Sequence, residues 1–181
     1  KNIAQHAESN HGYREVVSVT ADHDRHRYTL SECCARARQV SNLLDRLGSE
    51  RGARIATLAW NDFRHLELYY GVSCSGRVLH TINPRLFAEQ LVYIINHAED
   101  EWVFFDVAFT AVLEQVAEQC PKVKGYIAMT APDHMPDSSL PNLQCYETLV
   151  EAESSDYVWP DFDERTASSL CYTSGTTGNP K

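Results

Sequence analysis

Apolar residues recur at three- and four-residue steps between positions 30 and 47, and this spacing predicts an amphipathic helix. Thr29 and Glu32 precede it with the spacing of a capping box, in which each side chain accepts a hydrogen bond from a backbone N–H. Gly48 follows the last apolar residue, as is common where a helix ends. Both boundaries of this helix are therefore marked in the sequence.

After this helix, short β-prone runs alternate with segments of helical periodicity. In chain order the predicted elements are strand 55–60, helix 62–75, strand 78–82, helix 87–97, strand 102–106, helix 109–119, strand 126–129 and the apolar pair 170–171. Such alternation builds right-handed βαβ units whose strands pair in parallel. The sequence therefore predicts an α/β fold with a largely parallel sheet and flanking helices. The polar, proline-containing stretches 130–143 and 153–165 are predicted to be surface loops.

Upstream of the helix, the runs 15–20 and 27–30 flank a polar turn and predict a β-hairpin. The turn contains His23 and His26, which could ligate a metal ion. No further ligands cluster nearby, and exposed histidines in a charged turn are usually solvated, so the metal site is the less favoured interpretation.

Composition narrows the class of protein. Hydrophobic residues make up 43% of the 181 positions, enough for a globular core. The 16 basic and 25 acidic residues give a net charge of -9, which disfavours a nucleic-acid surface. The six cysteines lack paired spacing, and no stretch has the roughly 18 apolar residues of a membrane span. We therefore expect a cytoplasmic protein with reduced thiols and no membrane span.

Two polar dipeptides follow predicted strands, Asn61-Asp62 and Asn83-Pro84. Ligands collect beyond the carboxyl ends of parallel strands, so both positions are candidates for ligand contact. A helix N-cap at the first and a turn at the second are the favoured interpretations, and we assign neither a catalytic role.

The sequence ends with Tyr172-Thr-Ser-Gly-Thr-Thr-Gly-Asn-Pro-Lys181, after the apolar pair at 170–171. Glycines at 175 and 178 allow backbone conformations in which successive N–H groups converge on an anion. A Walker loop needs four residues between its glycines, whereas two stand here, so an ordinary P-loop NTPase is disfavoured. For a generic segment of this composition, a polar surface turn would be the more common interpretation.

This ten-residue string resembles the signature loop of the adenylate-forming (AMP-binding) superfamily. Further strings resemble landmarks of its fatty-acyl-CoA synthetase branch, over nearly the whole chain: Arg27-Tyr-Thr-Leu-Ser-Glu32, Ile55-Ala-Thr-Leu-Ala-Trp-Asn61, His65-Leu-Glu-Leu-Tyr69, Leu79-His-Thr-Ile-Asn-Pro-Arg-Leu86 and Tyr93-Ile-Ile-Asn-His-Ala-Glu-Asp100. The last two are closer to medium- and long-chain fatty acid ligases than to amino-acid adenylation domains or luciferases.

The resemblance implies an enzyme that uses ATP and Mg²⁺ to convert a carboxylic acid, here a fatty acid, into an acyl-adenylate and then a coenzyme A thioester. It carries a phosphate-binding role to seven residues: Thr173, Ser174, Gly175, Thr176, Thr177, Gly178 and Lys181. Thr173 or Thr176 is the candidate contact to Mg²⁺. No catalytic residue is assigned.

The resemblance further implies that residues 1–181 are an incomplete N-terminal portion of the large domain, without the C-terminal domain. We therefore expect this polypeptide alone to be inactive. One alternative is a ligase for another carboxylic acid, either aryl or short-chain and sulfur-containing. Another is a non-catalytic oligomerisation or binding module derived from a synthetase. A homodimer is expected for the parent enzyme.

Overall fold

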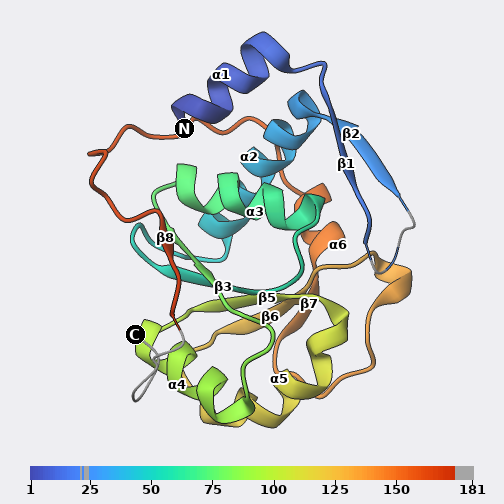
Figure 1. The fold of residues 1–181 in the computed structure, drawn as a ribbon, viewed down its shortest axis with the longest axis vertical. Helices are drawn as coiled ribbons and strands as arrows, with labels where there is room; N and C mark the ends of the chain where they lie inside the picture. Colours follow the sequence, from blue (N-terminus) through green and yellow to red (C-terminus); the bar gives the residue numbers. More distant parts are fainter. Residues whose placement is uncertain (21, 23–24, 174–181) are drawn as a thin grey trace.

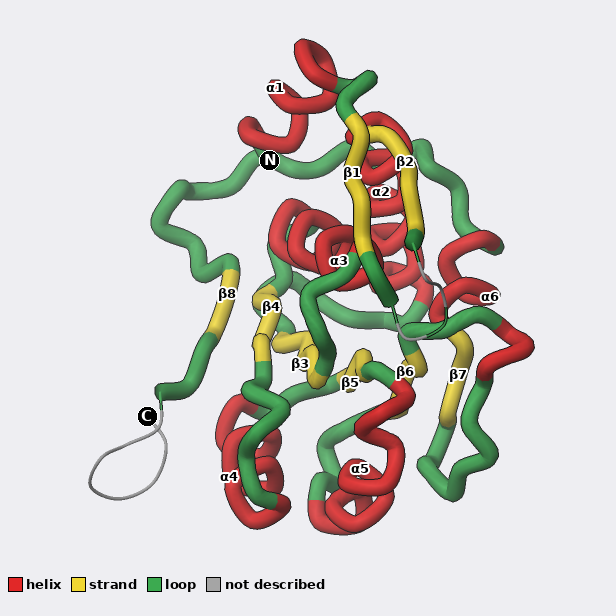
Figure 2. The backbone as a smooth tube through the Cα atoms, turned by 45° about the vertical axis from the view of Figure 1, so that its right-hand side comes forward, coloured by secondary structure: helices red, strands yellow, loops and turns green. Residues whose placement is uncertain are grey.

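A parallel sheet of six strands forms the centre of the protein (Figures 1 and 2). The computed structural model describes residues 1–173 except 21, 23 and 24. In spatial order the strands are β7 (Leu143–Cys145), β6 (Gly125–Ala128), β5 (Trp102–Phe105), β3 (Arg54–Leu58), β4 (Val78–Thr81) and β8 (Ser169–Leu170). Every neighbouring pair runs parallel, which confirms the predicted α/β fold.

Helices cover both faces of the sheet (Figure 1). On one face lie α2 (Leu30–Arg46), α3 (Phe63–Cys74) and α6 (Tyr146–Glu151); on the other lie α4 (Ala88–Ala98) and α5 (Thr110–Val116). Short 3₁₀ turns span Val107–Phe109, Ala117–Gln119 and Pro132–His134. The predicted helix 109–119 is thus an α-helical centre with a 3₁₀ turn at each end.

The central strand β3 shows how the two cores form. Ile55 packs with the cluster beneath α2, α3 and α6, whereas Ala56 and Leu58 pack with the cluster beneath α4 and α5. Alternate side chains of a strand point to opposite faces, so a sheet covered on both faces needs apolar residues at successive positions.

Helix α2 begins at the predicted capping box. The Glu32 N–H donates to Thr29 Oγ1 at 3.2 Å, and the Thr29 N–H donates to Glu32 Oε2 at 2.6 Å. Further along, α2 approaches α3 closely at Gly71. A Cβ atom there would lie 2.6 Å from Val40 Cβ and 2.7 Å from the Ala37 carbonyl oxygen. The absence of a side chain at Gly71 is what lets these two helices touch.

The N-terminal region adds one element that the sequence pattern did not reveal. Helix α1 (Asn2–His11) packs on α2, to which Arg38 ties it through two hydrogen bonds with Glu8, at 2.7 and 2.9 Å. The predicted hairpin follows as β1 (Glu15–Ser18) and β2 (His26–Thr29), paired antiparallel.

A connecting segment, residues 152–168, carries the chain from α6 across the outside of α2 to the far edge of the sheet (Figure 1). Trp159 fixes it by inserting a buried ring whose Nε1–H donates to Ser41 Oγ at 2.9 Å. Asn42 and Arg38 donate to the carbonyls of Ser154 and Ser155 at 2.7 and 3.0 Å. Strand β8 then pairs with β4.

Candidate functional site

The segment predicted to bind phosphate begins at the carboxyl end of β8. Leu79 and His80 of β4 pair with Ser169 and Leu170, so β8 leaves the sheet at the same edge as the other parallel strands. Thr173 follows as an exposed residue. The remaining predicted residues, Ser174, Gly175, Thr176, Thr177, Gly178 and Lys181, lie outside the described residues.

Tyr172 links β8 to this segment and is half-buried. Its ring packs against the apolar cluster beneath α4 and α5. Its hydroxyl lies 2.5 Å from Nδ1 of His97 on α4. Burial raises the pKa of Tyr172, and the charge of nearby Asp100 raises it further. Tyr172 is therefore docked onto the body of the protein.

The two polar dipeptides at neighbouring strand ends have structural roles. Asp62 Oδ1 accepts from the His65 N–H at 2.9 Å, so Asp62 is the N-cap of α3. Asn83 Oδ1 accepts from the Arg85 N–H at 3.0 Å and closes a turn. These contacts agree with the favoured sequence interpretation of both pairs.

A carboxyl group that the sequence analysis did not single out lies at the end of β5. Asp106 Oδ2 accepts from the Trp60 N–H, which joins the ends of β5 and β3. Burial raises the pKa of Asp106 to about 6, and the charge of Asp62 adds to this effect. The strand ends thus hold a carboxyl group that titrates near neutrality.

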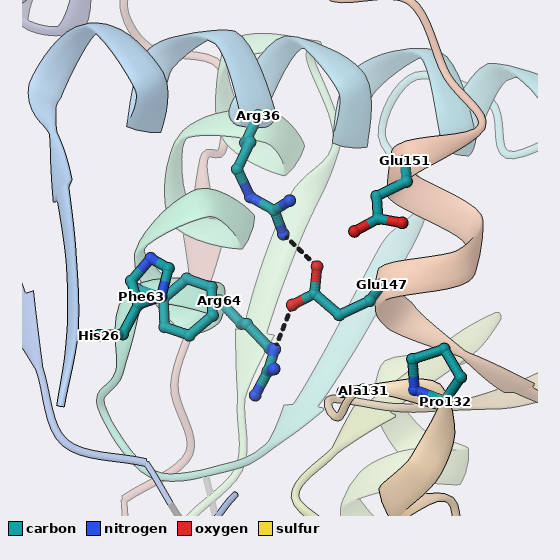
Figure 3. Close-up of a pocket in the computed structure, with 8 residues that line it drawn as sticks. All are labelled: His26, Arg36, Phe63, Arg64, Ala131, Pro132, Glu147 and Glu151. Carbon is teal, nitrogen blue, oxygen red and sulfur yellow. Dashed lines mark hydrogen bonds and ion pairs between the residues drawn. The ribbon is translucent and has the colours of Figure 1, made fainter. Parts of the chain in front are cut away.

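A pocket of about 280 Å³ opens between the hairpin, α2, α3 and α6 (Figure 3). Glu147 joins two guanidinium groups across it: its carboxylate accepts from Arg64 Nε at 2.6 Å and from Arg36 Nη2 at 2.8 Å. Arg64 also pairs with Asp22 of the hairpin turn at 2.8 Å, and Arg36 with Glu67 at 2.7 Å. The network joins two guanidinium groups to three carboxyl groups, and it fastens three helices and the hairpin turn together.

Burial in this network raises the pKa of Glu67 to about 7, although Arg36 opposes the shift. Tyr146 donates to the same carboxylate at 2.8 Å. Nearby, the His26 ring stacks on Phe63 with centroids 3.6 Å apart. His23 lies outside the described residues, and within the described ones no group of three His, Cys, Asp or Glu side chains is arranged to hold a metal ion.

Comparison with known proteins shows the family of this chain. The profile of a family described as AMP-binding enzyme matches residues 3–181. The chain belongs to the AMP-binding enzyme family. It is 47% identical over 180 residues to a medium-chain-fatty-acid–CoA ligase of Ectopseudomonas oleovorans, covering 99% of this chain and 33% of that protein. It is 48% identical over 180 residues to a 3-methylmercaptopropionyl-CoA ligase of Ruegeria lacuscaerulensis, with the same coverage.

The fold of this AMP-binding enzyme chain agrees with that of a crystallised anthranilate CoA ligase in complex with anthranoyl-AMP. The TM-score is 0.83 at 19% identity, and the match covers 98% of this chain and 33% of the other. The chain thus spans about a third of the length of the curated relatives it matches. Among the described residues, no helix combines the length and apolar character that crossing a membrane requires.

Proposed function

We propose that this chain contributes the triphosphate-binding part of an ATP-dependent acyl-CoA ligase. One observation carries the proposal: the string Tyr172–Lys181 follows the carboxyl end of a parallel strand, in a chain that matches the AMP-binding family along residues 3–181. Ligands in open parallel sheets bind beyond this edge. The two ligases that share 47% and 48% identity with the chain support the same reaction class.

The proposed reaction has two steps. A carboxylate oxygen attacks the α-phosphorus of ATP, the bond to the bridging oxygen breaks, and pyrophosphate leaves with the electron pair. The thiolate of coenzyme A then attacks the acyl carbon and AMP departs. In the first step, negative charge builds on the leaving phosphates, where fixed N–H and hydroxyl donors are most effective. We assign this donor role to Thr173, Ser174, Gly175, Thr176, Thr177 and Gly178, with the Lys181 ammonium as their cation.

The residues also fit Mg²⁺ as the accompanying ion. Mg²⁺ prefers oxygen donors and usually takes one or two protein ligands, with phosphates and water completing its shell. Thr173 is an exposed residue just after β8, and Thr176 carries a second hydroxyl in the sequence. The ion would neutralise the phosphate oxygens, while Thr173 or Thr176 fixes its place.

The substrate we propose is a fatty acid, since the strings at 79–86 and 93–100 resemble that branch. An aryl acid or a short sulfur-containing acid is the second candidate, and the Ruegeria relative favours the latter. We place the enzyme in the cytoplasm, because its six cysteines are free thiols. We also propose that the enzyme forms a homodimer.

Pyrophosphate exchange tests the proposed ligase activity. The assay uses a protein of the relatives' full length, of which this chain is about a third. Each acid is supplied with Mg-ATP and labelled pyrophosphate: straight-chain acids from butyrate to palmitate, benzoate, and 3-methylmercaptopropionate. We expect label to enter ATP with the straight-chain acids and to be lost in the Lys181→Ala variant. Lys122→Ala, in the segment that leads into the amino end of β6, is the matched control. Exchange with benzoate or 3-methylmercaptopropionate alone would establish the second candidate. Absence of exchange with every acid would favour a non-catalytic module.

A further inference from the structure

A buried histidine–aspartate pair lies beneath the start of the proposed phosphate-binding segment. His80 of β4 pairs in register with Leu170 of β8, two residues before Tyr172. His80 Nδ1 lies 2.8 Å from Asp100 Oδ2, and both side chains are fully buried. Burial raises the pKa of Asp100, while His80 opposes the shift. Two strings singled out by the sequence analysis, at 79–86 and 93–100, therefore meet at this point.

A purely structural role does not explain why this pair is buried, because its unsatisfied polar atoms reduce the stability of the fold. His80 Nε2 and Asp100 Oδ1 are both buried, and neither has a hydrogen-bond partner among the described residues. Unsatisfied polar atoms in a core reduce stability, and apolar side chains of similar volume often serve as well or better. A buried polar pair with two unsatisfied atoms is therefore better explained by a role other than packing.

The described residue that lies on this pair is Tyr172. Its ring centroid is 5.2 Å from that of His80 and 5.8 Å from that of His97. His97 holds the hydroxyl of Tyr172 at 2.5 Å, and Tyr93 stacks on His97 with centroids 5.4 Å apart. The Tyr172 side chain thus contacts His80 of the sheet and His97 of α4. Figure 2 shows β4, β8 and α4 as neighbours.

We propose that His80, Asp100 and His97 are positioning residues, which hold Tyr172 and thereby set where the phosphate-binding segment leaves the sheet. The inference rests on the proposed function. Thr173 and the glycines follow Tyr172 directly, so a displacement of its ring moves the first donors toward or away from the phosphates. Positional errors of about 1 Å are costly in such sites.

The first test removes only the hydroxyl of Tyr172. Pyrophosphate exchange is measured in the full-length ligase for Tyr172→Phe, with Tyr13→Phe as a matched control, because Tyr13 is a 70% exposed tyrosine near the hairpin. We expect Tyr172→Phe to raise KM for ATP about fivefold, the value of one hydrogen bond of about 1 kcal/mol. KM for the acid and the midpoint of unfolding should match the control.

The second test separates positioning from stability. The double variant His80→Leu/Asp100→Ala replaces the buried pair with apolar side chains of similar summed volume. We expect an equal or higher unfolding midpoint and a raised KM for ATP. Adding Tyr172→Phe should raise KM little further, since both changes act through the position of the Tyr172 side chain. An unchanged KM in the apolar variant, or effects that simply multiply, would show that the pair does not act through Tyr172.

The outcomes also distinguish this inference from the function on which it rests. If the wild-type ligase exchanges pyrophosphate but Tyr172→Phe leaves KM for ATP within twofold of wild type, the inference fails alone. If the wild type exchanges none with any acid, the proposed function fails and the role of Tyr172 with it. In the 181-residue chain, ¹⁵N spectra of His97 report the contact independently of activity: a hydrogen-bonded Nδ1 signal that Tyr172→Phe shifts supports it, and an unchanged signal overturns it.

Discussion

Replacing Gly71 by alanine should destabilise the protein, although it improves the intrinsic helix propensity of α3. In an exposed helix, Gly→Ala stabilises by about 1 kcal/mol. Here the added Cβ would lie 2.6 Å from both Cβ and Cγ1 of Val40 and 2.7 Å from the Ala37 carbonyl oxygen, inside any allowed contact. Overpacking of this kind costs about 1–3 kcal/mol, and the backbone oxygen cannot turn aside as a side chain would. The clash should prevail, with a net loss of up to about 2 kcal/mol.

A double-mutant cycle with Val40→Ala tests the cause of this loss. Val40 is fully buried, so its truncation alone should cost about 2 kcal/mol through lost packing. Val40→Ala removes the contact with Cγ1 but leaves those with Cβ and the Ala37 oxygen, so the double variant should be more stable than the sum predicts by about 1 kcal/mol at most. Urea unfolding of the purified chain, followed by circular dichroism, gives all four free energies. A Gly71→Ala variant more stable than wild type would refute the steric argument, and additivity within about 0.5 kcal/mol would show that Val40 Cγ1 takes no part in the clash.

Three further predictions concern a cap, a titrating group and the ligand. Thr29→Ala should lower the free energy of unfolding by about 1 kcal/mol, as measured in urea, because Glu32 loses the hydroxyl that caps α2. Folding raises the pKa of Asp106 from 3.8 to about 6, so the folded protein binds this proton more tightly than the unfolded chain does. The protonated carboxyl therefore contributes its full stability below about pH 4, and this contribution is lost as the pH rises through 6. Asp106→Asn should therefore flatten the fall in urea midpoint between pH 4 and 7, and an unchanged slope would contradict the assignment. Calorimetry of the isolated 181-residue chain should show Mg-ATP binding weaker than about 1 mM, since the α-carboxylate at Lys181 repels phosphate; micromolar affinity would disprove this.

The sequence predicted those parts of the fold that depend on local pattern. The capping box at Thr29 and the apolar period of α2 are both local, and the structure confirms them. The alternation of strands and helices was sufficient to predict a parallel sheet. For most elements, the predicted boundaries lie within about two residues of those in the structure. Helix α1 was missed because only Ala4 of its residues is buried, which leaves no apolar stripe. Strand β7 is three residues long and continues from a polar loop, so it gave no signal of its own.

The contacts around the candidate site were less accessible to sequence reasoning. Arg64 and Glu147 meet across 83 positions, and His97 and Tyr172 across 75, distances over which a periodic pattern carries no information. Asp106 was read as the end of a strand, and its raised pKa follows from burial that only the assembled sheet provides. The phosphate-binding segment itself could be recognised because its residue types and spacing are contiguous. Its binding role stays a prediction for Thr173 and for Ser174–Lys181, the latter lying outside the described residues.

The route of the connecting segment 152–168 has a kinetic consequence. Strand β8, which leads into the proposed phosphate-binding segment, pairs with β4 only after the chain has passed β5, β6, β7 and α6 and crossed α2. Non-local closures of this kind form late, because loop entropy must be overcome before the new contacts are made. During synthesis, the other five strands can assemble before this edge is complete. Trp159, buried by the crossing and bonded to Ser41, should therefore report a slow final phase of refolding in its fluorescence.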